Sequence, residues 1–90
     1  MVAKPYVTKT TADKAVNVDE KRDVVDITNL TGRTIYVSDE PDLTTTNGTP
    51  IFNNGRFEAS KFTGFDPQKA WYLIDTVAGG DVRIIEGRLK

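Results

Sequence analysis

One stretch near the C-terminus decides the fold: residues 70–77 read AWYLIDTV, residues 78–80 read AGG, and residues 81–86 read DVRIIE. It holds the only tryptophan of the chain and its densest run of β-branched and aromatic residues, which favour strands. Because a glycine pair separates two strand-like runs, the stretch predicts a β-hairpin.

Two registers are conceivable for this hairpin. A two-residue turn at Gly79 and Gly80 places Asp75 opposite Ile84, which wastes apolar surface. A three-residue loop over residues 78–80, with glycine as the left-handed bulge residue, places apolar residues opposite apolar residues and an acidic residue opposite a basic one. We expect this second register, whose pairs are Ile74 with Ile84, Leu73 with Ile85, and Asp75 with Arg83.

Apolar and polar residues alternate in several other segments, which predicts further strands. Residues 24–28 and 33–38 flank a turn at 29–32 and form a second expected hairpin. Residues 56–62 also alternate, whereas residues 49–52 resemble an edge strand because Pro50 lacks a backbone donor. The shared core is expected to contain Val25, Ile27, Ile35, Val37, Ile74 and Ile84.

Strands spaced at about ten residues, with turn signals between them and no long amphipathic helix, predict an all-β chain. We expect a small antiparallel β-sandwich or barrel, jelly-roll-like in its connections. Ninety residues suffice for one domain, which we place at residues 15–90. The mixed charge run at residues 19–23 is expected to be a solvated turn.

Residues 1–14 are either an N-terminal arm or a first strand. Tyr6 and Val7 are their only sizeable apolar anchors, and ordering a backbone costs about 1–2 kcal/mol per residue. We therefore expect an arm that leaves its own domain to contact a neighbour, adding a strand to an exposed sheet edge. A first strand paired within the domain is the alternative.

Composition excludes several classes of function. Twelve basic and thirteen acidic residues leave a net charge of −1, so no positive excess is present for nucleic-acid binding. The chain has no cysteine and no histidine, which excludes disulfides, the usual zinc sites and catalysis with a histidine base. We expect no cofactor. The N-terminus lacks the apolar region of a signal peptide and no apolar run approaches the length of a membrane span, so we expect a soluble protein made in a cytoplasm.

Few residues suggest chemistry. Residues 39, 40 and 42 are acidic but lack the ligand spacing of a calcium loop, so we expect a turn and no metal site. Asp75 is expected to pair with Arg83 across the hairpin, not to form a catalytic carboxylate pair with Asp81. Aromatic residues at positions 36, 71 and 72 would suit a platform for a sugar or a base, although strand aromatics more often lie in a core or interface.

A layout of turns and strands over residues 24–86 resembles small virion proteins of tailed bacteriophages. A strand ends at Asn29, the run TIYV follows at residues 34–37, and NGTPI stands at residues 47–51. A glycine before an aromatic comes next at residues 55–57, and the pattern closes on residues 72–84. The resemblance implies a β-sandwich that decorates capsids or forms the attachment part of a fibre or tail protein.

We therefore expect a non-enzymatic structural protein of a phage virion, synthesised in the host cytoplasm. The leading hypothesis is a capsid decoration protein, homo-oligomeric, that binds the major capsid protein or another virion protein in many copies. The alternative is a carbohydrate- or receptor-binding module of a tail or fibre. An exposed Trp71 beside a groove would favour the module, and a buried Trp71 the structural protein. The candidate partner-binding residues are Tyr6, Val7, Tyr36, Trp71 and Tyr72.

Overall fold

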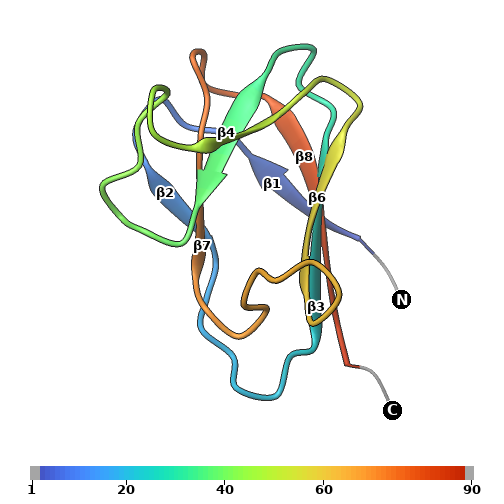
Figure 1. Cartoon of the computed structure of the whole chain (residues 1–90). Helices are drawn as coiled ribbons and strands as arrows, with labels where there is room; N and C mark the ends of the chain where they lie inside the picture. The colour runs from blue at the N-terminus through green and yellow to red at the C-terminus, as the bar shows by residue number, and fades with distance from the viewer. Residues whose placement is uncertain (1–2, 89–90) are drawn as a thin grey trace.

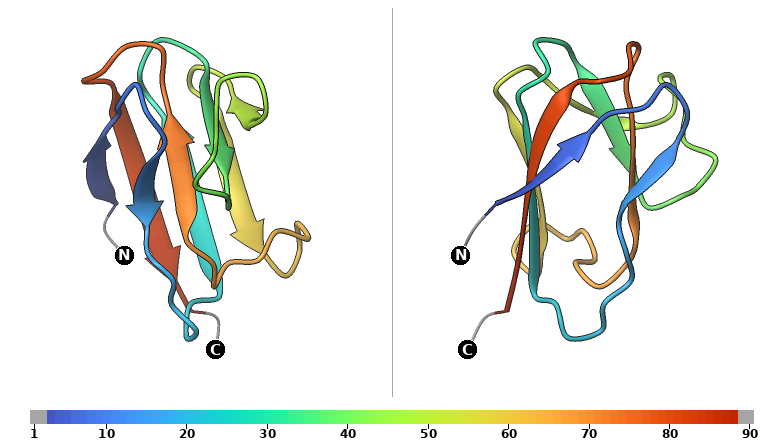
Figure 2. Two further views of the ribbon diagram at one scale, coloured as in Figure 1. Left: turned by 90° about the vertical axis from the view of Figure 1, so that its left-hand side faces the viewer. Right: turned by 180° about the vertical axis from the view of Figure 1, so that it is seen from behind.

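A computed structural model describes residues 3–88 of the chain, and within this range it contains strands but no helix. The strands lie in two layers that face each other (Figures 1 and 2). Their bounds are β1 Lys4–Val7, β2 Asp13–Val16, β3 Val24–Asn29, β4 Ile35–Ser38, β5 Thr49–Ile51, β6 Arg56–Ser60, β7 Trp71–Ile74 and β8 Asp81–Gly87.

The strand order identifies the architecture. One sheet has the order β1-β8-β3-β6 and the other has the order β2-β7-β4-β5, and every pairing is antiparallel. Successive strands cross between the layers, except that β4 and β5 lie side by side. This is the order of an eight-stranded jelly roll. The predicted all-β sandwich is therefore confirmed.

Both expected hairpins are wrong. β7 pairs with β2 and β4, whereas β8 lies in the opposite sheet and pairs with β1 and β3. Neither register of the 70–86 stretch exists, because its two halves never pair. β3 and β4 are likewise in different sheets. The alternation correctly located the strands, but it carries no information on which strand lies next to which.

The core fills the space between the two sheets. Val25 and Ile27 of β3 alternate with half-exposed residues, as predicted, and Ile84 of β8 lies opposite Ile27. Of the six expected core residues, only Ile74 lies outside the central cluster, because it faces the outer side of its sheet opposite Tyr36. The cluster consists of Val16, Val25, Ile27, Ile35, Val37, Ile51, Phe57, Ala59, Trp71, Leu73, Val82 and Ile84.

The N-terminal segment has the first-strand arrangement, not that of the arm we favoured. β1 forms one border of its sheet beside β8, and β2 pairs with β7 (Figure 2). Tyr6 packs against the core and its hydroxyl donates to Asp13 Oδ2 at 2.6 Å. Contacts within the domain thus supply the stabilisation that the arm prediction requires from a neighbour. Residues 1 and 2 of the expected arm lie outside the described residues.

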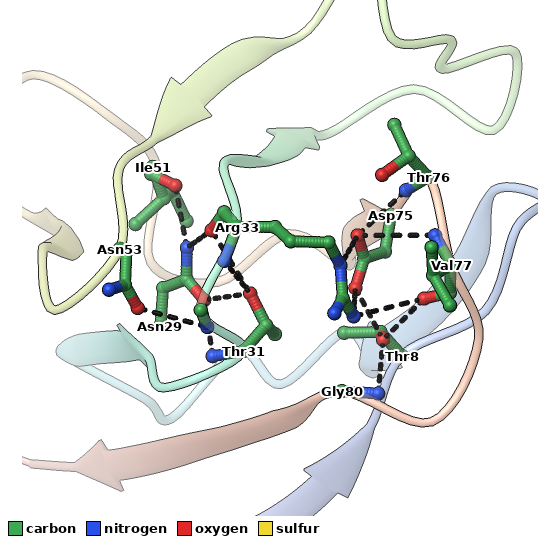
Figure 3. A network of polar contacts seen from close by, with 11 residues as sticks. Thr8, Asn29, Thr31, Arg33, Ile51, Asn53, Asp75, Thr76, Val77 and Gly80 are labelled. Atoms are coloured by element: carbon green, nitrogen blue, oxygen red, sulfur yellow. Dashed lines mark hydrogen bonds and ion pairs between the residues drawn. The ribbon is translucent and has the colours of Figure 1, made fainter.

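A polar network joins three crossings at one end of the sandwich (Figure 3). Asp75, at the end of β7, is fully buried and accepts from Arg33 Nη2 at 2.7 Å and Nε at 3.1 Å. The hydroxyl of Thr8, just after β1, donates to Asp75 Oδ2 at 2.8 Å and accepts from the N–H of Gly80 at 2.8 Å. The β1–β2, β3–β4 and β7–β8 connections are therefore held together.

Asn29 extends the same network to the fourth connection at this end. Its amide nitrogen donates to the carbonyl oxygens of Arg33 at 2.6 Å and Ile51 at 2.8 Å. Its amide oxygen accepts from the N–H and the hydroxyl of Thr31. Asn29 is buried, so these bonds satisfy a side chain that would otherwise be costly to enclose.

The opposite end is held by Arg22, which is 2% exposed although it belongs to the charge run predicted to be solvated. Its guanidinium donates to the carbonyl oxygens of Pro67 at 2.6 Å, Asn17 at 2.8 Å and Lys69 at 2.7 Å. It also forms an ion pair with Glu86 at 2.7 Å. A planar five-donor group explains how one cation satisfies acceptors from three segments while buried. The solvated-turn prediction is wrong for this residue.

Candidate functional site

The outer face of the β2-β7-β4-β5 sheet is the candidate site. Tyr36 lies between the core residues Ile35 and Val37, and Tyr72 lies between Trp71 and Leu73, so both tyrosines point away from the core. Tyr36 stands opposite Ile74 and Ser38 opposite Tyr72. The tyrosines therefore occupy diagonal positions on adjacent strands, within reach of each other for aromatic side chains.

The residues around the two tyrosines continue this face across the sheet. Lys14 of β2 stands opposite Tyr72, and Pro50 of β5 stands opposite Tyr36. Both tyrosines are half-buried, and Ile74 between them is buried although it lies on the outer side. We call Tyr36, Tyr72, Ile74 and Pro50 the tyrosine face. It is an apolar patch with two hydroxyl groups, of the kind that suits a protein contact.

Trp71 is not part of this face. It points inward and is 4% exposed, with its ring 5.0 Å from Phe57 and 6.0 Å from Phe65, measured between centroids. Its indole N–H donates to the carbonyl oxygen of Asp66 at 3.0 Å. The tryptophan therefore anchors the β6–β7 connection and offers almost no surface to a ligand.

The two N-terminal candidates are separate from the tyrosines. Tyr6 turns toward the core, and burial, with the hydrogen bond to Asp13, raises the pKa of its hydroxyl. Val7 is exposed on the outer face of the other sheet. Of the five predicted partner-binding residues, the structure thus brings together Tyr36 and Tyr72.

The expected Asp75–Arg83 pair does not form. Burial acts to raise the pKa of Asp75, but hydrogen bonds from Arg33, Thr8 and two backbone N–H groups outweigh it and lower that pKa. Arg83 pairs instead with Asp81 in its own strand, at 3.0 Å. Asp75 is fully buried and accepts from both side-chain and backbone donors, so its contacts hold the connections at this end together.

A second carboxylate, that of Asp26, lies in an unfavourable electrostatic environment on the outer face of the β1-β8-β3-β6 sheet. Asp26 stands directly opposite Glu58, and Arg56 contacts both, at 2.8 Å and 3.4 Å. Asp26 Oδ1 is buried without a hydrogen-bond partner. Burial, together with the charge of Glu58, raises the pKa of Asp26 despite the opposing charge of Arg56.

The acidic residues 39, 40 and 42 lie in the β4–β5 connection. Asp39 pairs with Lys69 at 3.1 Å. In the part of the chain that the structure describes, no group of three or more acidic side chains is placed to hold a metal ion. Nor does any helix in residues 3–88 have the length and apolar character needed to cross a membrane.

Two cavities flank the β6–β7 connection, which the sequence did not single out. The larger, of about 550 Å³, is lined by Phe65, Lys61, Asp66, Gln68 and their neighbours. The smaller, of about 300 Å³, lies between the same connection and the β4–β5 connection. The sequence feature that could have drawn attention to this connection is the pair of phenylalanines at positions 62 and 65. In the structure their side chains are 77% and 41% exposed.

Comparisons of this chain with protein-family models, with curated proteins and with solved structures found no match.

Proposed function

We propose that the chain is a non-enzymatic structural protein of a tailed-phage virion, a capsid decoration protein that binds the outer shell in many copies. The tyrosine face is the proposed contact with the shell. The observation that carries this proposal is the diagonal placement of Tyr36 and Tyr72 on the outer face of the β2-β7-β4-β5 sheet. Tyrosine supplies a large contact area with few rotatable bonds and is enriched in protein interfaces.

The scaffold beneath this face supports the same proposal. Both ends of the sandwich are held by buried polar contacts, around Asp75 at one end and Arg22 at the other. A surface that is already ordered loses little conformational freedom on binding, which favours attachment through a modest area. Repeated on a symmetric shell and strengthened by contacts between copies, weak contacts of this kind add up through multivalency.

Two further observations agree with a structural role. Trp71 is buried in the core, which is the arrangement that favours the structural protein over a binding module. The jelly-roll order is used by viral capsid proteins, although it is also used by lectins and so does not by itself separate the two functions.

The second candidate function is a carbohydrate- or receptor-binding module of a tail or fibre. The larger cavity beside the β6–β7 connection favours it, because an exposed Phe65 ring there stands near Lys61, Asp66 and Gln68. A sugar site combines an aromatic surface with a few polar groups that fix orientation.

Cosedimentation with phage particles tests the proposal. Purified chain is mixed with particles of the phage that encodes it, stripped of their own copy, and binding is measured for the wild type and for Tyr36→Ser and Tyr72→Ser. We expect each substitution to weaken binding by about tenfold or more. Val77→Ser and Leu30→Ser, at exposed positions away from this face, are the matched controls and should bind as the wild type does.

The same assay distinguishes the second candidate. If binding requires Phe65 and a cell-surface glycan, while the two tyrosine variants bind normally, the chain is a receptor-binding module. All variants should retain the melting temperature of the wild type within a few degrees, which excludes unfolding as the cause.

A further inference from the structure

The free borders of the two sheets are protected to different degrees against the addition of another strand. β1 and β6 border one sheet, and β2 and β5 border the other. β1 contains Pro5, β5 contains Pro50, and the register of β2 shifts between Lys14 and Val16. Prolines and bulges at sheet borders prevent the addition of another strand. β6 has neither device and is the longest of the border strands, at five residues.

The hydrogen-bond pattern shows which backbone groups β6 offers. The N–H of Asn29 donates to the carbonyl oxygen of Gly55 at 2.9 Å. Since bonded and non-bonded pairs alternate in an antiparallel ladder, the next bonded pair is Ile27 with Phe57. The N–H and C=O groups of Arg56 and Glu58 therefore point away from β3 to the free border.

Beyond Glu58, the border is closed by the chain itself. The N–H of Ser60 donates to the hydroxyl of Thr63 at 3.1 Å, and the carbonyl oxygen of Ser60 accepts from the N–H of Thr63 at 3.2 Å. The open part of the border is thus the three-residue segment from Arg56 to Glu58. In Figure 2 (left), β6 lies at the right-hand border of the rear sheet.

We propose that two copies of this chain associate through their β6 strands, as an antiparallel pair with its two-fold axis at Phe57. In this register Arg56 of one copy stands opposite Glu58 of the other, twice, and each pair exchanges both backbone hydrogen bonds. The two sheets become one continuous sheet across the interface. This inference does not depend on the proposed contact with a shell.

Charge complementarity selects the second copy as occupant. The sequence Arg56-Phe57-Glu58 is complementary to itself when read antiparallel, because each basic residue meets an acidic one. The competing register, centred on Glu58, would place two like charges opposite each other. It would also need the backbone groups of Ser60, which Thr63 already occupies.

Exposed apolar side chains gather at the two ends of β6. All four phenylalanines of the chain lie between residues 52 and 65. Phe57 is buried in the middle of β6, whereas Phe52, Phe62 and Phe65 before and after it are 67%, 77% and 41% exposed. Antiparallel pairing brings the start of β6 in one copy beside the end of β6 in the other. Phenylalanines from both copies then share a surface removed from water.

Charge-reversal variants test the proposal by sedimentation equilibrium of the full chain. The wild type should be dimeric. Arg56→Glu and Glu58→Arg should each raise the dimer dissociation constant by about tenfold or more, because like charges then face each other. Arg83→Glu, a charge reversal two strands away on the same sheet face, is the matched control and should leave the dimer intact.

Mixing the two variants distinguishes pairing from misfolding. In the mixture, every acidic position of the Arg56→Glu variant faces a basic position of the Glu58→Arg variant, so heterodimers should form with near wild-type affinity. The Glu58 amide should also exchange its hydrogen more slowly in the wild-type dimer than in the diluted monomer. A wild type that stays monomeric at millimolar concentration, a dimer insensitive to both reversals, or a mixture without heterodimers would overturn the proposal.

Discussion

Arg33 and Asp75, forty-two positions apart in the chain, form a two-bond ion pair that joins the β3–β4 crossing to the β7–β8 crossing. The carboxylate is fully buried, while the guanidinium is partly open to solvent. Because both crossings carry the chain from one sheet to the other, this contact links the two layers at that end (Figure 3).

Replacing Asp75 should therefore be costly. Asp75→Ala leaves the buried hydroxyl of Thr8 without this acceptor and the guanidinium of Arg33 without its carboxylate, and we expect a loss of roughly 3 kcal/mol in the free energy of unfolding. Urea unfolding followed by circular dichroism measures it. Asp81→Ala removes an exposed ion pair within one strand and should leave the midpoint unchanged.

The lowered pKa of the same carboxylate predicts that the free energy of unfolding falls at acidic pH. The folded-state pKa of Asp75 lies below its ordinary value, so its contribution is complete above the unfolded pKa of about 3.9 and is lost as pH falls toward the folded value. The free energy of unfolding should therefore decline in this acidic range. In Asp75→Asn that part of the decline should be missing; an unchanged pH profile would contradict the account.

Asp26 should behave in the opposite sense. Its folded-state pKa is raised, chiefly by burial, so the charged form opposes folding at neutral pH and the penalty disappears on protonation. We expect Asp26→Asn to raise the melting temperature at pH 7 and to have little effect at pH 3. A drop in melting temperature at pH 7 would mean that the contact with Arg56 dominates.

Substitutions of Arg22 test how much the buried polar contacts at the other end of the sandwich stabilise the fold. Arg22→Ala leaves three backbone carbonyl groups and Glu86 without their shared donor, and we expect a loss of about 3–5 kcal/mol in the free energy of unfolding. Arg22→Lys should not recover it, because an ammonium lacks the planar set of donors. Lys21→Ala, at the exposed neighbouring position, should be neutral.

Alanine substitutions at the two adjacent glycines of the β7–β8 connection should lower the free energy of unfolding, each for a different reason. A Cβ on Gly80 would lie 2.6 Å from Thr31 Cγ2 and 2.8 Å from Thr8 Oγ1, inside the polar network. We expect Gly80→Ala to cost about 1–3 kcal/mol through overpacking. Gly79 has open space but a φ of 92°, so Gly79→Ala should cost only about 1–2 kcal/mol through backbone strain. Replacing Gly79 by Asn should recover part of that loss, and the same substitution at Gly80 should not.

Local patterns were enough to find the strands but not to pair them. The alternation around Val25 and Ile27 reports that one side of a segment is buried, which is a local property. Residues 75–80 cross to the other sheet, and in the fold Asp75 bonds to Thr8 and Arg33, which are distant in sequence. No feature of the 70–86 stretch itself separates this crossing from a hairpin.

The candidate site shows the same limit. That Tyr36 and Tyr72 face outward follows from their alternation with apolar neighbours, but their diagonal placement requires the β4–β7 pairing. Burial of Arg22 had no sequence signal, since a charged residue in a charge run is normally solvated. Its acceptors come from the segments at residues 17, 67 and 69, which only the folded chain brings together.

Cryo-electron microscopy of purified phage particles tests the central claim most directly. We predict density for the jelly roll at many symmetry-related positions on the outer shell, with Tyr36 and Tyr72 against the capsid protein and the β6 border directed to a neighbouring copy. Absence of the chain from the particles, its presence at a single tail position, or a tyrosine face directed to solvent would contradict the account.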